Sequence, residues 1–473
     1  MASSPPLVLT AVDIAAATGG TVVGGAMHRH ERFSIDSRTL APGQFFIALR
    51  GDRFDGAVFA TTSLERGASG VMLGRYAGMA QSLAAAWPDR SVIEIDDTLA
   101  GLQALGRHVR RLSDARVTAI TGSAGKTTTK EAAADFLATR YRVYRNPGNL
   151  NNHIGLPLSL LDLVTRPDMA VVELGMNHRG EISQLVAIAE PDVRVWTNVG
   201  DAHAGYFVSI DEIADAKAEI FEGASVSTLL VANADDERVM ARTPRFPGRT
   251  VTFGTSDRAE VRAIDVEDLG IDGTRAVLRT PSGSARLEIP LVGRGNLMNV
   301  LAAAAVALEF EVPVQAIVAR AAVLKPARRR GERVVLRDGV TLLDDSYNSS
   351  PSALRRTLEA VSRDRVHRRR VAVLGEMLEL GDFSMPLHEE CGRATAAAHI
   401  DVLIAVGGPP AYRLAEAAVA SGLPAGAVRY VSTSEDAAAL ATRTVKPGDL
   451  VLVKGSRGIR TDLVVDRLRE DWS

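Results

Sequence analysis

The sequence predicts an α/β fold with three domains, and two observations support this prediction. The 473 residues exceed what one hydrophobic core usually organises, so the chain is expected to divide. From residue 117 onward, and again beyond residue 340, short apolar runs alternate with helical stretches. Such alternation is typical of parallel sheets that are covered by helices. We therefore expect domains over residues 1–95, 96–328 and 329–473.

Short β-like stretches among Gly- and Asp-rich turns predict a small α/β domain at the N-terminus, and residues 45–49 are an example. The central domain is expected to hold a mostly parallel sheet. Its first candidate strand starts at Val117, and others comprise residues 169–173, 193–197, 229–231 and 251–253. Over residues 261–290, alternating segments with turn signals at Asp272-Gly273 and Pro281-Ser282-Gly283 predict a small antiparallel insert.

The third domain is expected to be a Rossmann-like α/β domain. Its candidate strands alternate with helical patterns and comprise residues 340–343, 371–374, 402–406 and 450–453. No Gly-x-Gly-x-x-Gly occurs in this part of the sequence, so a dinucleotide site has no fingerprint on which to rest. The basic segment over residues 325–331 is expected to join this domain to the central one.

A candidate phosphate-binding loop follows the first strand of the central domain, where residues 117–130 read VTAITGSAGKTTTK. The Gly-rich turn lets backbone N–H groups converge on an anion, and it comprises Gly122, Ser123, Ala124 and Gly125. The helix expected from Lys130 onward points its positive end at the same place. Lys126 can reach the β- and γ-phosphates, and the Thr127 hydroxyl can bind Mg²⁺. Although Ile120 occupies the first glycine position of the usual motif, we predict a nucleoside triphosphate site; the alternative is a Gly-rich turn before an ordinary helix.

Polar residues also follow the neighbouring strands of the central domain. Glu173 ends an apolar run, where ligands bind in open α/β sheets, and it can bind Mg²⁺ or cap the next helix. His203 comes after the strand at 193–197 and can bind a second metal ion, oriented by Asn198 and Asp201, or be structural. Lys217 lies on a helix that starts with the capping box over residues 209–212, and periodicity alone makes it a solvated residue.

The third domain repeats this arrangement. Residues 344–348 (DDSYN) place acids after one apolar strand, and residues 454–458 (KGSRG) place basic and small residues after another. The second of these tracts can form an anion nest. Polar strand ends in two domains suit a cleft that closes around ATP and other substrates.

The composition argues against several classes of protein. With 46% hydrophobic and 24% charged residues and a net charge of −2, we expect neither a nucleic-acid partner nor a membrane partner. No apolar run reaches about 18 residues, so no membrane-spanning helix is predicted. The single cysteine, Cys391, excludes an intramolecular disulfide, and the N-terminus has no basic region of a signal peptide. We expect a reduced, cytoplasmic monomer.

Taken together, the motifs resemble those of the ATP-dependent Mur ligases of peptidoglycan synthesis, across nearly the whole chain. Residues 121–129 (TGSAGKTTT) look like the family's own variant of the phosphate loop, which accounts for the missing first glycine. Residues 149–157 (NLNNHIGLP), 197–203 (TNVGDAH) and 296–299 (NLMN) match further family segments. Residues 344–348 and 374–381 (LGEMLELG) are similar to the member that adds D-alanyl-D-alanine, and the Asp-Asn-Pro-Arg motif of the preceding ligase is absent.

The resemblance implies a nucleotide and metal site. The ATP phosphates would be held by Gly122, Ser123, Ala124, Gly125, Lys126, Thr127 and Thr128. Asn296 and Asn299 would contact adenine, and Asp345 the ribose. The ligands of Mg²⁺, of which two ions are expected, would be Thr127, Glu173 and His203.

The resemblance also implies catalytic and substrate residues. The catalytic residues would be Lys126, His203 and Lys217. Lys217 would react with CO₂ to give a carbamate, which requires an uncharged amine and hence a lowered pKa. The residues that face the UDP-linked substrate and the incoming dipeptide would be Ser34, Asp36, Ser37, Arg38, Asn151, Asn152, Asn348, Lys454, Ser456 and Arg457.

Two positions depart from the family pattern. The family usually has His before the first Asn of the segment at 296–299, whereas this chain has Gly295. The arginine of a Gly-Arg pair at the start of the third domain has no clean counterpart, so four arginines compete for its role beside the phosphates: Arg328, Arg329, Arg330 and Arg333.

The resemblance therefore implies an ATP-dependent ligase that joins D-alanyl-D-alanine to UDP-N-acetylmuramoyl-tripeptide through an acyl phosphate. Its partners would be these small molecules. One alternative is another amide ligase of the superfamily, such as a folylpolyglutamate synthetase, against which the segment Asp36-Ser37-Arg38 argues. Another is a nucleotide switch that hydrolyses GTP, but no Asn-Lys-x-Asp guanine motif occurs.

Overall fold

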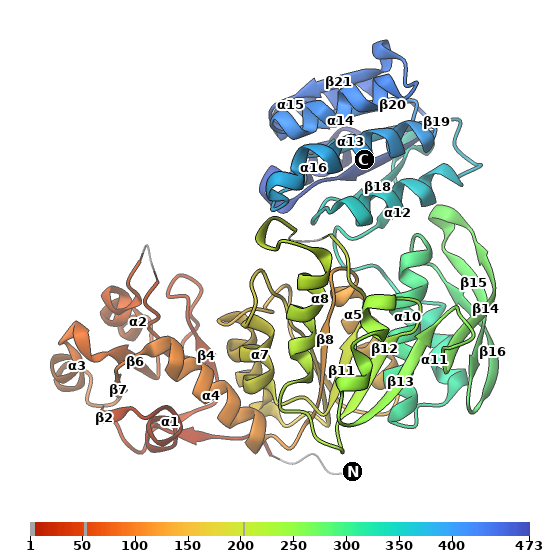
Figure 1. Ribbon diagram of the computed structural model, residues 1–473. Helices are drawn as coiled ribbons and strands as arrows, with labels where there is room; N and C mark the ends of the chain where they lie inside the picture. Colours follow the sequence, from red (N-terminus) through yellow and green to blue (C-terminus); the bar gives the residue numbers. More distant parts are fainter. Residues whose placement is uncertain (1–4, 52–53, 202–203) are drawn as a thin grey trace. The chain divides into compact units, whose positions relative to one another are not determined.

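The computed structural model describes residues 5–51, 54–201 and 204–473, which form two compact units. The first unit comprises Met1–Thr121, Arg140–Arg194 and Glu219–Leu229. The second comprises Gly122–Thr139, Val195–Ala218 and Leu230–Ser473. The colours of Figure 1 follow the sequence through both. The predicted domain boundaries after residues 95 and 328 stay predictions.

The first unit begins with a five-stranded sheet in the order β2-β7-β6-β5-β4. Its strands β4 to β7 run parallel, and β2 is antiparallel to β7. Phe46, Val71 and Val92 of this sheet pack into one buried cluster. The strands are β2 (Thr21–Gly24), β4 (Phe33–Ser34), β5 (Phe45–Ile47), β6 (Gly70–Gly74) and β7 (Ser91–Ile95), with β1 (Leu9–Thr10) and β3 (Arg29–His30) as a separate pair. The helices are α1 (Ala11–Thr18), α2 (Ala60–Glu65), α3 (Ala80–Ala86) and α4 (Thr98–Leu112).

A second, nine-stranded sheet has the order β16-β15-β14-β13-β12-β11-β8-β10-β9. In the first unit, β10 lies parallel to both β8 and β9, with Glu173 of β10 opposite Ile120 of β8. Strands β8 and β10 are buried almost throughout, which is why they appear as largely apolar runs. The elements here are β8 (Arg116–Thr121), β9 (Val143–Arg145), β10 (Met169–Glu173), α6 (Gly155–Leu160) and α7 (Glu181–Ala189).

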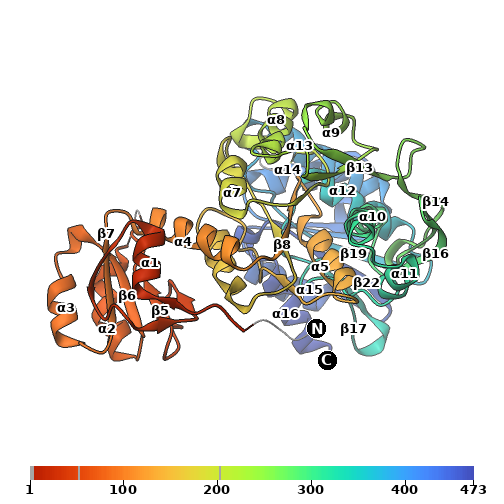
Figure 2. The same cartoon turned by 90° about the horizontal axis from the view of Figure 1, so that it is seen from below.

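The predicted antiparallel insert is present in the second unit, as an extension of the same sheet. Strand β14 pairs in parallel with β13, and then antiparallel with β15, which pairs antiparallel with β16. Helix α11 lies beside β16 (Figures 1 and 2). The strands are β11 (Val193–Trp196), β12 (Leu229–Asn233), β13 (Arg249–Gly254), β14 (Val261–Asp268), β15 (Thr274–Thr280) and β16 (Gly283–Ile289). The helices are α5 (Lys126–Leu137), α8 (Ile210–Ala218), α9 (Glu237–Met240), α10 (Arg294–Glu309) and α11 (Val314–Ala321).

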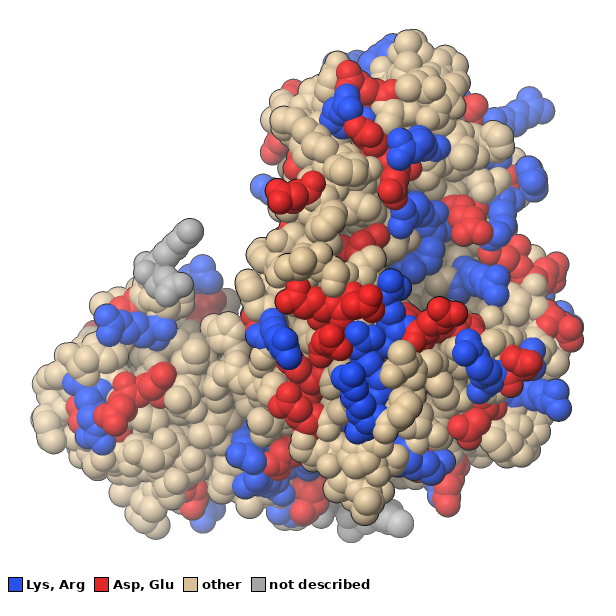
Figure 3. Space-filling model, in the orientation of Figure 1, with Lys and Arg blue, Asp and Glu red and all other residues tan. Residues whose placement is uncertain are grey.

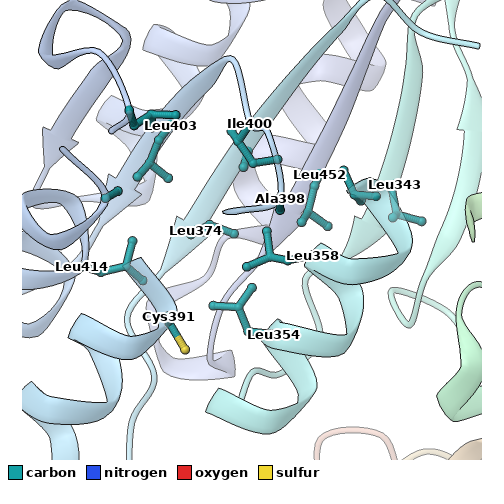
Figure 4. Packing of buried hydrophobic residues seen from close by; sticks show 14 of the residues in the cluster. Leu343, Leu354, Leu358, Leu374, Cys391, Ala398, Ile400, Leu403, Leu414 and Leu452 are labelled. Atoms are coloured by element: carbon teal, nitrogen blue, oxygen red, sulfur yellow. The ribbon is translucent and has the colours of Figure 1, made fainter. Parts of the chain in front are cut away.

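The C-terminal part of the second unit is a six-stranded sheet in the order β17-β18-β22-β19-β20-β21, with helices on both faces. Leucines of α12, α13 residue Cys391 and α14 residue Leu414 pack on one face, as Figure 4 shows. Ala441 of α15 and Val464 of α16 pack on the other. The strands are β17 (Glu332–Val335), β18 (Thr341–Asp345), β19 (Arg369–Gly375), β20 (Val402–Val406), β21 (Val428–Val431) and β22 (Asp449–Lys454). The helices are α12 (Pro351–Ser362), α13 (Ser384–Ala397), α14 (Pro409–Ala420), α15 (Ser434–Thr444) and α16 (Asp462–Asp471).

The surface and the helices agree with the composition. Figure 3 shows lysine and arginine side chains interspersed with aspartate and glutamate over one face, in keeping with the net charge of −2. Within the described residues, no helix combines the length and the apolar character that crossing a bilayer requires.

Candidate active site

Two glycines shape the loop between β8 and α5. Gly122 has a φ of 149° and Gly125 a φ of 84°, a backbone region that favours glycine. A Cβ at Gly122 would lie 1.9 Å from Thr197 Oγ1, and one at Gly125 would lie 2.0 Å from Asn299 Oδ1. Neither position can accept a side chain, so the loop is a tightly built turn whose backbone lies against polar groups.

Residues after β11 brace this loop. Ala124 N–H donates to Asn198 Oδ1 at 2.9 Å, and Ser123 N–H donates to the Asn198 carbonyl oxygen at 3.1 Å. Gly200 N–H donates to Ser123 Oγ at 2.9 Å. We expected Asn198 to orient His203, but His203 lies outside the described residues. The described contacts of Asn198 hold the loop in shape.

The loop and the start of α5 fit a triphosphate. Helix α5 begins at Lys126, four residues before the predicted Lys130, because Gly125 itself is the N-cap. Since Gly125 has no side chain, no N-cap side chain competes with an anion at this positive helix end. Lys126 Nζ donates to the Gly122 carbonyl oxygen at 2.8 Å, so its ammonium lies over the loop. Thr127 follows in the first turn, and its hydroxyl oxygen is a donor type that Mg²⁺ accepts.

Lys217 of α8 is buried, with 2% of its surface exposed. The interpretation of Lys217 as a solvated helix residue is therefore wrong, because periodicity does not reveal what packs over a helix face. Burial lowers the pKa of Lys217 well below its usual value, and the charge of Lys126 lowers it further. The predicted capping box is half formed: Ser209 Oγ accepts from Glu212 N–H at 3.2 Å, whereas the Glu212 carboxylate accepts from Val208 N–H at 2.7 Å.

Glu173 lies buried at the end of β10 in the first unit, as predicted. Asn151 Nδ2 donates to its carboxylate, and Glu173 N–H donates to Asn146 Oδ1 at 3.3 Å. Asn152 Oδ1 accepts from the N–H of Gly155, the first residue of α6, at 2.8 Å. Of the two asparagines predicted to face substrate, one thus holds the candidate metal ligand and the other holds a helix start.

The described residues contain no group of three His, Cys, Asp or Glu side chains that could hold a metal ion. Mg²⁺ needs no such cluster, because it commonly takes one or two carboxylates together with phosphate oxygens and water. The oxygen donors of Thr127 and Glu173 are therefore chemically suited to it, each in its own unit.

The candidate adenine residues lie at the start of α10, against the phosphate loop. Asn299 Nδ2 donates to Asn296 Oδ1 at 3.0 Å, and Asn296 Nδ2 donates to the Val292 carbonyl oxygen at 2.9 Å. Thr129 Oγ1 of α5 donates to Asn299 Oδ1 at 3.4 Å. Asn299 is buried and fixed in orientation, and Asn296 is held beside it.

The predicted polar strand ends of the C-terminal sheet come together. Strand β18 lies parallel to β22 with Asp345 opposite Lys454, and Lys454 Nζ donates to Asp345 Oδ2 at 2.7 Å. Lys454 Nζ also donates to the Asn348 carbonyl oxygen at 3.0 Å. Ser456 Oγ accepts from Leu378 N–H at 2.9 Å. Asp345, Asn348, Lys454 and Ser456 therefore form one cluster at the carboxyl edge of this sheet.

The four competing arginines differ in their contacts. Arg329 pairs with Asp462 at 2.7 Å and with Asp466 at 3.0 Å, and Arg333 pairs with Asp272. Arg330 lies over the Tyr347 ring, 4.1 Å from its centroid. Arg457 donates to the Tyr347 hydroxyl at 3.2 Å. Arg328 is exposed. Only Arg330 of the four stacks on a residue that follows Asp345.

The N-terminal candidates form one turn after β4. Ser34 Oγ accepts from Asp36 N–H at 3.2 Å, and Ser37 contributes its carbonyl oxygen to Arg66 at 2.6 Å. The Arg38 guanidinium donates to both carboxylate oxygens of Asp36, at 2.9 and 2.7 Å. Hydrogen bonds from the Arg38 side chain, and then from its N–H, lower the pKa of Asp36 to about 2. Because the Arg38 side chain is 86% exposed, its outer face is open to a ligand.

Comparison with known proteins decides the family. A model described as the Mur ligase middle domain matches residues 120–307, and one described as the Mur ligase, glutamate ligase domain matches residues 329–457. The UDP-N-acetylmuramoyl-tripeptide–D-alanyl-D-alanine ligase of Bacillus subtilis (strain 168) is 33% identical over 437 residues, which are 92% of this chain and 93% of that protein. The chain belongs to the Mur ligase family.

Solved structures agree with this assignment. MurF from Acinetobacter baumannii superposes on this Mur ligase with a TM-score of 0.86 at 29% identity, over 99% of this chain and 100% of that one. MurF ligase from Thermotoga maritima in complex with ADP gives a TM-score of 0.80 at 28% identity, over 93% of this chain and 97% of that one. The predicted three-domain α/β fold is thereby confirmed.

Sequence reasoning missed several residues that hold this Mur ligase's site together. Thr357 of α12 donates to Asp345 Oδ2 at 3.0 Å, and Ser352 of the same helix donates to Asp201 Oδ1 at 2.7 Å. Thr197 Oγ1 donates to the Ala124 carbonyl oxygen at 2.9 Å. No local pattern marks such contacts, because each joins residues that are remote in sequence or hidden within a helix repeat.

Proposed function

We propose that this Mur ligase joins D-alanyl-D-alanine to UDP-N-acetylmuramoyl-tripeptide while ATP is cleaved to ADP and phosphate. Relatives that it matches over most of their length carry this activity in their names, and one solved relative carries ADP. The structural observation that carries the proposal is the burial of Lys217 near the charge of Lys126. A buried amine with a lowered pKa beside a phosphate loop suits a ligase with a carbamylated lysine, and a nucleotide switch does not require it.

In the first step, a carboxylate oxygen of the tripeptide attacks the γ-phosphorus of ATP, the bond from that phosphorus to the bridging oxygen breaks, and ADP leaves. The product is an acyl phosphate. Both reacting groups are negative, so the step needs positive charge at fixed positions. The Lys126 ammonium and the amino end of α5 would supply part of it, since both lie at the loop of Gly122 and Gly125.

In the second step, the amine of D-alanyl-D-alanine attacks the acyl carbonyl carbon. The bond from that carbon to the phosphate oxygen breaks, phosphate leaves, and the amine proton passes to solvent or a nearby base. A dry site favours this outcome because water would otherwise hydrolyse the acyl phosphate.

We propose that Thr127, Glu173 and His203 hold Mg²⁺ and that Lys217 carries a carbamate. When bound, Mg²⁺ would neutralise phosphate charge and orient the phosphate oxygens. The carbamate forms when the uncharged Lys217 amine attacks CO₂ and loses a proton, which turns a neutral side chain into an anion. The burial of Lys217 supports this, because it favours the uncharged amine.

We also propose that Arg330 is the arginine that faces the phosphates. Arg329 and Arg333 are held by acidic partners, whereas the Arg330 guanidinium lies on the face of Tyr347 and has no acidic partner among the described residues. Arg330→Ala should lower kcat by roughly 100-fold, the scale seen when one charge-stabilising donor is lost. Arg328→Ala is the matched control and should keep wild-type activity; the reverse result would move the role to Arg328.

The remaining substrate roles are proposed on the same basis. The turn with Ser34, Asp36, Ser37 and Arg38 would face the UDP-linked substrate, together with Asn151 and Asn152. The cluster of Asn348, Lys454, Ser456 and Arg457 would face the incoming dipeptide and the acyl phosphate. We further propose that the protein acts in the cytoplasm as a monomer.

The test is phosphate release from ATP, measured with each substrate alone and with both. Turnover that requires both UDP-N-acetylmuramoyl-tripeptide and D-alanyl-D-alanine, with equal amounts of phosphate and ligated product, supports the proposal. Turnover without either substrate would contradict it and favour a hydrolytic nucleotide switch. Turnover with a folate and glutamate would favour the other amide ligase.

A further inference from the structure

Gly295 lies at the start of α10, directly before Asn296, and an arginine of α12 lies over it. A Cβ at Gly295 would be 3.5 Å from Cδ and 3.6 Å from Nε of Arg356, which is ordinary van der Waals contact. Two positions earlier, at the N-cap of α10, a Cβ at Gly293 would be 3.4 Å from that of Ala360. Helix α12 therefore packs beside the start of α10, with the Arg356 side chain along residue 295.

The neighbours of Arg356 on α12 are engaged, whereas Arg356 is not. Arg355 pairs with Asp201 at 3.4 Å and with Glu390 at 2.7 Å, and Thr357 donates to Asp345. Arg356 is exposed and, within the described residues, forms neither an ion pair nor a hydrogen bond. A guanidinium that is placed by packing but has no acceptor is available to a ligand.

Protein atoms nevertheless cover part of this side chain. Desolvation lowers the pKa of Arg356, the charge of Arg355 acts in the same direction, and Asp201 opposes them. The guanidinium remains charged at neutral pH, since arginine stays protonated in proteins. It is thus a partly desolvated cation, and such cations bind aromatic faces more strongly than fully solvated ones do.

The position of Arg356 indicates which ligand it meets. Beside it is Gly295, next to Asn296, the proposed adenine contact. The next residue of α12 is Thr357, whose hydroxyl donates to Asp345, the proposed ribose contact. A planar guanidinium stacks on aromatic rings, and the purine is the aromatic part of the proposed nucleotide.

We infer that Arg356 contacts the adenine ring of ATP with its guanidinium face, beside Gly295. This inference rests on the proposed function, because it takes the nucleotide to lie between Asn296 and Asp345. It assigns to α12 a residue that binds the base and thereby helps to position ATP for attack.

The test is the binding of ATP and ADP to purified full-length protein, measured by calorimetry for three variants. Arg356→Ala should weaken the binding of ATP and of ADP by the same factor, roughly tenfold, since both nucleotides carry the base. Arg356→Lys should lose most of the same affinity, because lysine keeps the charge but not the planar face. Arg365→Ala is the control, since Arg365 is also exposed and forms no ion pair or hydrogen bond in the described part of the chain.

Steady-state kinetics give the second readout. Arg356→Ala should raise KM for ATP by a similar factor and change kcat and the KM values of the other two substrates little. A greater loss for ATP than for ADP would overturn the inference in favour of a γ-phosphate contact. Full affinity in Arg356→Lys would overturn it in favour of charge alone, and unchanged affinity in Arg356→Ala would overturn it outright. Failure of the wild type to bind either nucleotide would instead contradict the proposed function.

Discussion

Lys217 is the residue whose environment is hardest to explain without a chemical role. It is buried, its pKa is lowered by desolvation and by Lys126, and in the described part of the chain it has no ion-pair partner. Burying an amine without a partner costs stability unless the group is neutral or modified. Conversion to a carbamate would give the buried Lys217 a chemical role that explains why the cost of its burial is retained.

Lys217→Ala should therefore reduce ligation by at least about 100-fold, the scale of loss for a group that stabilises charge in an active site. Acetate or propionate should restore part of the rate, because a small carboxylate can occupy the space of the missing carbamate. Ligation rates with and without added carboxylate measure this. Lys446→Ala removes an exposed lysine and is the control. Wild-type activity in Lys217→Ala would reduce Lys217 to a structural residue.

His30 predicts how the stability of the N-terminal part depends on pH. It is buried, with ring nitrogens 2.8 Å from Ser69 Oγ and 3.0 Å from Ser91 Oγ, and desolvation, aided by the charge of His28, lowers its pKa to about 4. As pH falls below about 6.5, His30 takes up a proton in the unfolded chain before it does so in the folded protein. The free energy of unfolding that depends on neutral His30 is therefore fully present above that pH and is lost as pH falls toward 4. This lowering of the His30 pKa corresponds to a loss of about 2 kcal/mol in the free energy of unfolding between pH 7 and pH 5.

Hydrogen exchange of β6 and β7, corrected for the intrinsic effect of pH, measures this loss. His30→Gln should remove most of the pH dependence, because glutamine does not titrate. His178→Gln is the control, since His178 is exposed and lies outside this sheet. An equal pH dependence in wild type and His30→Gln would assign the effect to other groups.

At the scale of elements, the sequence predicts buried strands more accurately than edge strands or the residues at which helices begin. Strands β10 and β20 coincide with the predicted residues 169–173 and 402–406, because both are buried, apolar and bounded by polar residues. Strands β17 and β21 were not predicted: they are edge strands of four residues each, partly exposed, and each contains at least one charged residue, so that its apolar run is short. The start of α5 was placed late because a positive φ at Gly125, and not a polar cap, begins it.

The candidate site was predictable where chemistry follows a strand directly and not where it depends on packing. Glu173, Asp345 and Lys454 were identified because each ends an apolar run. The burial of Lys217 and the approach of Arg356 to Gly295 depend on helices that pack from elsewhere in the chain, and no spacing rule contains that information.

Helix α12 has an unusual start that makes a further prediction. Its N-cap residue Ser350 forms no side-chain cap, and Asp201 instead accepts from Ser352 N–H at 3.2 Å and from Ser352 Oγ at 2.7 Å. Asp201 follows Gly200, whose carbonyl oxygen accepts from Ser123 Oγ of the phosphate loop at 3.2 Å. The loop, Asp201 and α12 are thus joined by successive contacts.

Asp201→Ala should remove this cap and the pairing with Arg355, at a cost of about 1–2 kcal/mol to the docking of α12. Hydrogen exchange of α12 should then become roughly 5- to 30-fold faster. Glu435→Ala, which removes an exposed acid from α15, should leave α12 unchanged. Unaltered exchange in α12 of the Asp201 variant would show that packing alone holds the helix.

At the scale of the whole molecule, the residues proposed to bind the UDP-linked substrate and those proposed to bind ATP belong to different parts of the chain. The turn with Asp36 and Arg38 belongs to the first compact unit, and the phosphate loop with Lys126 belongs to the second. Each has its own internal contacts: Arg38 pairs with Asp36, and Lys126 folds over Gly122. A substitution in one of two separately built sites should therefore leave ligand binding at the other site nearly unchanged.

Lys126→Ala should therefore abolish ligation and weaken ATP binding while leaving the affinity for UDP-N-acetylmuramoyl-tripeptide within about twofold of wild type, since the two sets of residues belong to separately built units. Arg38→Ala should weaken the binding of the UDP-linked substrate by roughly tenfold, because a charge-assisted contact is lost. It should leave ATP binding unchanged. Calorimetric titration of each variant with each ligand separates the two effects. Loss of both ligands in either variant would mean that the two sites depend on each other for their structure, and the division of roles along the chain would then be wrong.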